Sequence, residues 1–436
     1  MTRMLTAVTL VWLLLPVAEI RAQESASSGI TGRVVDSTQG ALPGAAVTVI
    51  NVGTGAVRST TTDEQGRFTL ANLPAATYRL RVELDGFAPT ELDRLVLRLG
   101  QVASPVVTHG VATLTDTVQV EAAAPLLQTQ SASVGQVIDE KQLETLPTLD
   151  RNLLNFVTLA AGVSPNLQRR EGSRTWYVTV EGGRDSSTNY AIDGVYVRAL
   201  RFNHLSLMPP IDSVQEVNLL RNSFSTEYGQ GQAVVSMATK SGTNQLSGSL
   251  SGYFRNERFN ARNYFAPADG AAPPFRRGVF GATLGGPVVR NRIFAFGSYE
   301  GGRTKESDIF LDVVPEPAFM QGNFSSLRQA IIDPLTGQPF PGNIIPASRF
   351  SRTAQIVGPM FTQPNVDGVE NFRRVGNRSA DSDTLTARFD EVLSANHNLF
   401  QRYMWWDSRR VSEEAFSVSR PPEGSRNLAL GHTWVI

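Results

Sequence analysis

The stretch from Asn189 to Phe254 constrains the fold more than any other part of the sequence. It begins with two short runs of β-branched and aromatic residues joined by Asp193-Gly194, a pair that predicts a β-hairpin. It ends with a segment that alternates between an apolar and a polar face, which is the period of a β-strand. A flexible glycine turn at 242–244 is expected between the two. The stretch therefore predicts a compact α+β unit followed by amphipathic strands.

Amphipathic alternation continues through the last part of the chain. The first strand places on its apolar face Leu246, Gly248, Leu250, Gly252 and Phe254. Further strands are expected at 279–284, 292–299, 307–314, 384–392, 398–406 and 427–436. In the fourth of these, apolar Leu385, Ala387 and Phe389 alternate with Thr384, Thr386, Arg388 and Asp390. Tyr403, Trp405 and Trp406 are expected near one strand end as part of an aromatic girdle, with core packing as the alternative.

Composition excludes several classes of function. The 436 residues suffice for two to four domains, and 40 basic side chains balance 40 acidic ones, so no nucleic-acid partner is predicted. The absence of cysteine excludes disulfides and thiolate chemistry. The four histidines are scattered along the sequence, and Asp381 with Asp383 is better explained by solvated charges than by a calcium site. We therefore predict no catalytic residue, no cofactor and no metal ligand.

The first 22 residues differ from the rest. Arg3 precedes a leucine-rich apolar run, 4–17, that is shorter than the roughly 20 residues needed to span a bilayer. Residues 1–22 are therefore expected to be a secretory signal peptide, with an N-terminal anchor helix as the alternative. Four arginines are expected to cluster between this region and the hairpin, as a solvated face or a site for an anion: Arg169, Arg170, Arg174 and Arg184.

Residues 29–110 contain short alternating runs separated by turn sequences, which predicts a small β-sandwich. The sequence TTDEQGRFTLANLPAATYRLRVELDGF resembles the transthyretin-like regulatory domain of carboxypeptidases, a resemblance that brings no catalytic residue. In the linker 111–130, residues 116–120 form one extended piece that could add as a strand to a partner's sheet edge. The alternatives are a last strand of the sandwich and a plain linker. After it, a helix is expected at Asp139–Leu146, and Asp150 is expected to cap a helix over Arg151–Ala160.

Taken in order, these segments resemble the TonB-dependent outer-membrane receptors, and in particular their Oar-like branch. The sequences that carry this resemblance are GGRDSSTNYAIDGVYV, VQEVNLLRNSFSTEYGQGQAVVSMATKSGTN, GSLSGYFRNERFNARNYFA and FGATLGGPVVRNRIFAFGSYEG. The resemblance implies a mainly β protein with a plug at 131–242 and the first strands of a transmembrane barrel at 243–436. It also implies a periplasmic N-terminal domain and contact with outer-membrane lipid.

The resemblance assigns one partner site. Asp116, Thr117, Val118, Gln119 and Val120 match the family's TonB box, which pairs as a strand with the inner-membrane protein TonB. The implied function is energy-coupled uptake of a substrate that the sequence does not identify. The alternative is a non-transporting surface or adhesion role. A barrel that encloses a plugged lumen needs on the order of 22 strands, and only seven are expected here. Since open sheet edges in lipid are costly, the sequence is expected to be a fragment or a truncated product.

Overall fold

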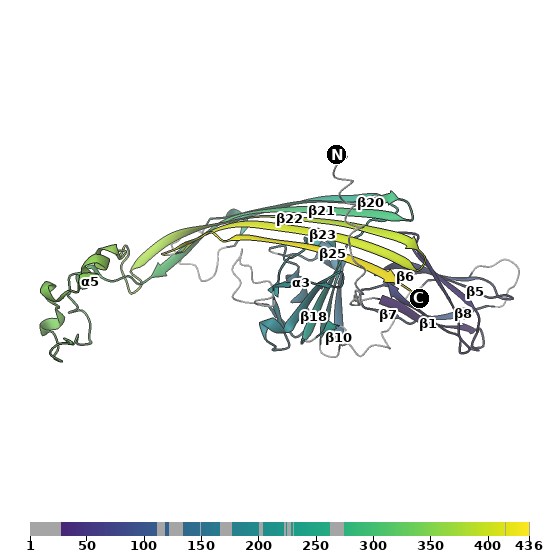
Figure 1. Ribbon diagram of the computed structural model, residues 1–436, viewed down its shortest axis with the longest axis horizontal. Coiled ribbons are helices and arrows are strands. Elements are labelled where there is room, and N and C mark those ends of the chain that lie inside the picture. The colour runs from purple at the N-terminus through teal and green to yellow at the C-terminus, as the bar shows by residue number, and fades with distance from the viewer. Residues whose placement is uncertain are drawn as a thin grey trace, which may run out of the picture.

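The computed structural model describes residues 28–110, 118–121, 134–148, 150–165, 177–199, 204–221, 224, 228–229, 231–261, 274–414 and 416–435. Three bodies follow one another along the chain. We call them the N-terminal sandwich (28–109), the central domain (134–239) and the long sheet (247–434). The long sheet arches over the central domain, and the N-terminal sandwich lies beside the central domain at one end of the sheet (Figure 1). The predicted signal peptide lies outside the described residues.

The N-terminal sandwich consists of two β-sheets around one apolar core. One sheet contains β1 (Ser28–Asp36), β4 (Arg67–Leu73), β7 (Val102–Ala103) and β8 (Val106–His109). The other has the order β3-β2-β5-β6-β9, formed by β2 (Ala46–Asn51), β3 (Val57–Thr61), β5 (Ala76–Glu83), β6 (Thr90–Leu97) and β9 (Val118–Glu121). Alternate residues of the strands, such as Val47, Val49 and Leu80, are fully buried. This alternation is why the strands were recognisable in the sequence.

The central domain is built on a five-stranded sheet with the order β10-β17-β18-β13-β14. Its strands are β10 (Val134–Asp139), β13 (Thr188–Ile192), β14 (Val195–Tyr196), β17 (Val214–Arg221) and β18 (Ala233–Thr239). All seven residues of β18 are buried, because this strand is covered on both faces. The domain also contains two short strand pairs, β11 (Val163–Pro165) with β12 (Val178–Val180) and β15 (Arg198–Ala199) with β16 (His204–Leu205), and two 3-10 turns, at 185–187 and 211–213.

Of the two helices predicted in the central domain, the first is present as predicted and the second is not. Helix α2 (Glu140–Thr145) begins after Asp139, whose side chain accepts a hydrogen bond from the Gln142 amide in a capping box. The second prediction was wrong. Only Leu154–Val157 is helical (α3), and Arg151 has a φ of 49°. Because Arg151 is in the left-handed region, the chain cannot continue from Asp150 into a helix.

The long sheet is antiparallel, and it confirms the predicted fold class. Its strands are β19 (Ser247–Asn256), β20 (Phe275–Val289), β21 (Ile293–Asp312), β22 (Phe372–Ser394), β23 (His397–Glu413), β24 (Val418–Ser419) and β25 (Pro422–Trp434). The segments 292–299 and 307–314, predicted as two strands, belong to the single 20-residue strand β21. The glycines between them, at 301 and 302, pair regularly with β20 and β22, so they do not end the strand.

The two faces of the long sheet differ in chemistry. One face turns away from the central domain and exposes large apolar side chains, among them Leu250 (90%), Leu246 (76%), Phe254 (69%), Leu428 (65%) and Phe389 (50%). The opposite face buries polar residues such as Thr386 (0%) and Ser298 (3%) against the central domain. This alternation, apolar outside and polar inside, is the pattern of a transmembrane barrel wall.

The aromatic cluster at 403–406 differs from its prediction. It lies in the middle of β23, and Trp406 points to the inner face, where it is buried. Since the side chains of a strand alternate, Tyr403 and Trp405 share the outer face and Trp406 cannot. Core packing, the alternative, is therefore correct for Trp406.

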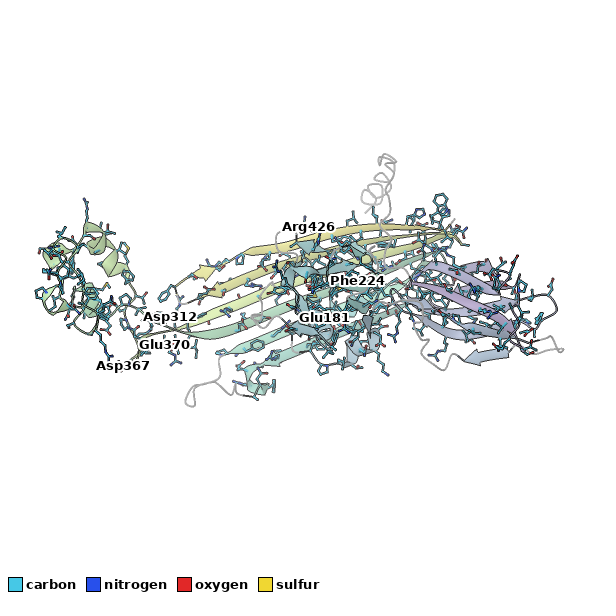
Figure 2. The ribbon with its side chains drawn as sticks, turned by 90° about the horizontal axis from the view of Figure 1, so that it is seen from below. Glu181, Phe224, Asp312, Asp367, Glu370 and Arg426 are labelled. Atoms are coloured by element: carbon cyan, nitrogen blue, oxygen red, sulfur yellow. The ribbon has the colours of Figure 1, made fainter. Side chains whose placement is uncertain are left out.

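The ends of the long sheet are also different. At the end near the N-terminal sandwich, β20 joins β21 and β22 joins β23 through short turns. At the other end β21 and β22 are joined by residues 313–371, which include α4 (Pro317–Met320), α5 (Arg352–Val357) and 3-10 turns at 341–343, 347–349 and 358–360. Asp312, Asp367 and Glu370 mark the junction between this insertion and the sheet (Figure 2). None of the described helices has the length and apolar character to cross a membrane.

The glycine turn at 242–244 is not the flexible hinge that the sequence suggested. A side chain on Gly242 would meet the carbonyl oxygens of Ala295 and Gly286 at 2.5 and 2.6 Å. The amide of Asn244 donates to the carbonyl of Gly53 at 2.8 Å, and its side chain donates to Asn291 at 2.7 Å. The turn is therefore packed between the sandwich and the long sheet.

Candidate functional site at the contact between the central domain and the long sheet

The first part of the contact is an ion-pair cluster around Asp193, which we call the Asp193 cluster. Asp193 and Gly194 form the predicted hairpin turn between β13 and β14, with φ values of 46° and 78°. This turn directs the Asp193 carboxylate toward the long sheet. There it accepts hydrogen bonds from Arg388 Nη1 at 2.9 Å and Arg402 Nη1 at 2.5 Å. Thr239 donates its amide and its hydroxyl to the same carboxylate, each at 2.8 Å.

The charges of the Asp193 cluster are balanced. Arg388 also binds Asp390 at 2.8 Å, and Arg402 donates to Asn427 at 2.8 Å, so two guanidinium groups face two carboxylates. Burial alone would raise the pKa of Asp193. The two arginines and the Thr239 hydrogen bonds outweigh burial and hold that pKa below its usual value. Because Arg402 is fully buried, the cluster depends on Asp193 remaining ionised.

A second cluster, the Arg151 cluster, lies on other strands of the long sheet. The left-handed backbone at Arg151 directs its side chain to Asp212 at 2.8 Å, in the same domain, and to Glu300 of β21 at 3.2 Å. The guanidinium also lies 4.1 Å from the ring centre of Tyr253 in β19. Ser251 of the same strand donates to Asp212 at 2.8 Å. The Arg151 cluster therefore joins the central domain to β19 and β21, as the Asp193 cluster joins it to β22 and β23.

Apolar packing supplements the two clusters. Met404 and Trp406 of β23 belong to the same buried cluster as the core residues of the central domain, including Tyr190, Ile192 and Met237. Arg277 of β20 adds a hydrogen bond to the carbonyl of Asp150 at 2.6 Å. Five neighbouring strands of the long sheet, β19 to β23, thus contact the central domain.

The N-terminal sandwich contacts the central domain mainly at the turn 98–100, which follows β6, and also at Ala75, whose carbonyl accepts a hydrogen bond from the Gln215 side chain at 3.2 Å. Arg98 forms an ion pair with Asp139 at 3.2 Å. The amide of Leu99 donates to the Glu216 carboxylate, and the Asn218 side chain donates to the Leu99 carbonyl at 2.8 Å. Burial raises the pKa of Glu216 to about 7, although the Leu99 hydrogen bond and Arg98 act in the opposite direction.

The structure describes only part of the predicted partner site. Asp116 and Thr117 lie outside the described residues. Val118, Gln119 and Val120 form β9 together with Glu121, which pairs in parallel with β6. Of the predicted arginine cluster, Arg169, Arg170 and Arg174 lie outside the described residues as well.

Two further expectations concern charged side chains. Asp383 is bound by Arg303 at 2.9 Å and by the Tyr299 hydroxyl at 2.5 Å, on the outer face of the sheet. His397 and His432, which are far apart in sequence, lie 3.2 Å apart between ring nitrogens and stack on each other. Only the pairing of β23 with β25 brings them together, so the sequence offered no signal for this contact. Within the described residues, no three potential metal ligands lie close enough together to hold an ion.

Comparison with protein families matches three consecutive parts of the chain. Residues 29–109 match the model of a carboxypeptidase regulatory-like domain, and residues 127–234 match the TonB-dependent receptor plug domain. Residues 238–436 match an outer membrane beta barrel domain. The matches follow the N-terminal sandwich, the central domain and the long sheet in order.

Individual proteins are similar over parts of their length. The TonB-dependent transporter Oar of Myxococcus xanthus is 25% identical over 287 residues, which cover 64% of this chain and 27% of that protein. Among solved structures, the outer membrane transporter YddB of Escherichia coli has a TM-score of 0.47 at 12% identity, over 69% of this chain and 37% of that one. A mutant of the ferric enterobactin receptor PfeA of Pseudomonas aeruginosa has a TM-score of 0.37 at 15% identity, over 66% and 34%.

Proposed function

We propose an energy-coupled uptake function from the premise that this chain belongs to the family of TonB-dependent outer-membrane transporters, with an N-terminal carboxypeptidase regulatory-like domain. The family is non-enzymatic, and its members are located in the outer membrane. In this proposal the central domain is the plug, predicted at 131–242, and the long sheet belongs to the barrel wall, predicted at 243–436. The plug packs against the wall and moves to admit a substrate.

The observation that carries the proposal is the kind of contact between plug and wall. Two ion-pair clusters, around Asp193 and Arg151, join the plug to strands β19, β21, β22 and β23. Ion pairs of this kind are specific in geometry, yet exchange with water offsets much of their attraction when they separate. Such a contact suits a domain that must stay closed at rest and still be displaced when work is done on it.

The orientation of the chain is part of the proposal. In bacterial outer-membrane barrels, short turns face the periplasm and long loops face outward. The short turns of the long sheet lie at the end where Asn244 contacts Gly53 of the sandwich, and the insertion 313–371 lies at the other. This arrangement supports a periplasmic sandwich (29–110) and an outward insertion.

The energy source in this proposal is TonB, which would bind the linker 111–130 at Asp116–Val120. Val118–Val120 supports this assignment because it already adopts a strand, the conformation that sheet addition requires. Deleting 116–120 is expected to abolish uptake and to leave substrate binding at the cell surface intact, because the deletion removes the point at which force is applied, together with most of β9, and leaves the plug and the barrel wall unchanged.

The experiment compares cells carrying the deletion with cells in which 116–120 is replaced by five residues of scrambled order. Both variants are checked for equal amounts in the outer membrane. Uptake at the wild-type rate by the deletion variant would refute TonB coupling through this segment.

A further inference from the structure

The strand β9 completes the edge of the sandwich sheet. It pairs with β6 in parallel, with Val118 opposite Thr90, Gln119 opposite Glu91 and Glu121 opposite Asp93. In the described part of the chain β9 is the last strand of the order β3-β2-β5-β6-β9. Residues 118–120 of the segment assigned to the partner are therefore part of a folded sheet.

A strand has two edges, and pairing with β6 uses one of them. In a strand the amide and carbonyl groups of successive residues point alternately to the two sides. A partner strand can therefore add to the outer edge of β9 while β9 stays on β6. The sandwich also fixes the backbone of these residues beforehand, which removes an ordering cost that a free linker would meet on binding.

The strand that holds β9 also contacts the plug. β6 ends at Leu97, and the next three residues form the turn that binds Glu216 and Asn218 of β17. Gly100 in this turn has a φ of 70°, and a side chain there would meet the side-chain nitrogen Nδ2 of Asn218 at 3.2 Å. Strand β17 lies between β10 and β18 in the plug sheet. A mechanical connection thus runs from β9 through β6 to the plug, beside the covalent connection from β9 to β10.

We propose that the N-terminal sandwich is a coupling adaptor: its β6 edge presents Val118–Glu121 as an ordered strand, to whose outer edge TonB adds, and its turn 98–100 transmits the pull to β17. This inference rests on the proposed function. It differs from an inhibitory arrangement, in which β9 would have to leave β6 before TonB could bind.

A disulfide between β6 and β9 separates these two arrangements. The chain has no cysteine, so Glu91→Cys with Gln119→Cys introduces a single possible bridge between residues that face each other. Thr90→Cys with Val118→Cys is a second, independent bridge in the same register. Arg81→Cys with Gln119→Cys is the control, since Arg81 lies one strand further away, on β5.

The measurement is the binding of the purified C-terminal domain of TonB to the detergent-solubilised protein, oxidised and reduced. The adaptor predicts that both facing pairs form the bridge, that the control pair does not, and that oxidation leaves the dissociation constant within about twofold. At least about tenfold weaker binding after oxidation, restored by reductant, would overturn the adaptor and favour the inhibitory arrangement. Failure of both facing pairs to form a bridge would also overturn it.

The proposed function and the adaptor fail in distinguishable ways. If reduced wild-type protein does not bind the TonB domain, TonB coupling itself is refuted, and the adaptor with it. If wild-type protein binds and only the oxidised pairs do not, the adaptor alone fails.

A second variant, Asn218→Ala, tests the turn: uptake should fall severalfold while TonB binding stays unchanged. Ser236→Ala, on the neighbouring strand β18, is its control and should retain uptake. Equal uptake by the two variants would overturn transmission through the turn.

Discussion

Replacing Asp193 by asparagine tests the contact between plug and wall. Asparagine keeps the shape of the side chain and an oxygen that accepts from Thr239, but it removes the charge that faces Arg388 and Arg402. Asp390 still balances one of the two guanidinium groups. The other is left buried without a counter-charge, a change that costs about 3–5 kcal/mol of folding free energy. Because asparagine still accepts hydrogen bonds, we expect the lower end, about 3 kcal/mol.

The matched control is Asp383→Asn. This residue also lies in an ion pair of the long sheet, with Arg303, but on the outer face and with 29% of its side chain exposed. A partly exposed pair contributes about 0–1 kcal/mol, so the control should lose less than about 1 kcal/mol. The two substitutions make the same chemical change: Asp193 of the central domain contacts the inner face of the long sheet, and Asp383 lies on its outer face.

The assay is urea unfolding in detergent, followed by tryptophan fluorescence, to which Trp406, buried against the plug core, contributes. The pKa of Asp193 lies below its usual value, so its contribution is present above about pH 4 and is lost only as the pH falls through the lowered pKa. The difference between Asp193→Asn and wild type should therefore be equal at pH 5 and pH 8. A loss for Asp193→Asn no larger than that for Asp383→Asn would refute the reasoning.

Three further predictions concern other contacts. Burial raises the pKa of Glu216 to about 7 from a reference value of 4.5. The contribution of this group to folding stability is therefore fully present at low pH, and up to about 3 kcal/mol of stability is lost as the pH rises from 4.5 through 7. Glu216→Gln should therefore flatten the fall in stability between pH 5 and pH 8, and an unchanged pH dependence in urea unfolding would contradict this. Leu250→Arg on the outer face should cost about 2–4 kcal/mol in a bilayer, whereas Ser249→Arg on the inner face should not, as measured by the yield of heat-stable membrane-inserted protein. Trp406→Ala should cost about 3–5 kcal/mol by creating a cavity against the plug core, and an equal effect of Trp405→Ala would contradict the assigned faces.

Sequence reasoning succeeded where a local pattern determines the structure. The alternation of Leu385, Ala387 and Phe389 with polar neighbours identified the outer face of β22, because a strand exposes alternate residues to opposite sides. Asp193-Gly194 identified a hairpin, because both residues tolerate positive φ. These signals lie within a few residues of one another.

The site itself depends on contacts between distant residues. Asp193 and Arg402 are 209 positions apart, and the sequence placed Arg388 on a polar face without indicating its partner. The position of Trp406 on the inner face followed from its parity in β23, which requires the strand to be located within one residue. The failed helix at Arg151 shows the same limit, because its left-handed backbone serves contacts with Glu300 and Tyr253 that lie on other strands.

Site-specific cross-linking in cells tests the central claim most directly. Because the chain contains no cysteine, a single cysteine placed in turn at 116, 117, 118, 119 and 120 reports only its own contacts. In cells that also carry single-cysteine TonB, the account predicts disulfide-linked complexes from this segment and none from a control cysteine at Ser59 on β3, the opposite edge of the same sheet. Absence of a TonB adduct at all five positions, with the protein present in the outer membrane, would contradict it.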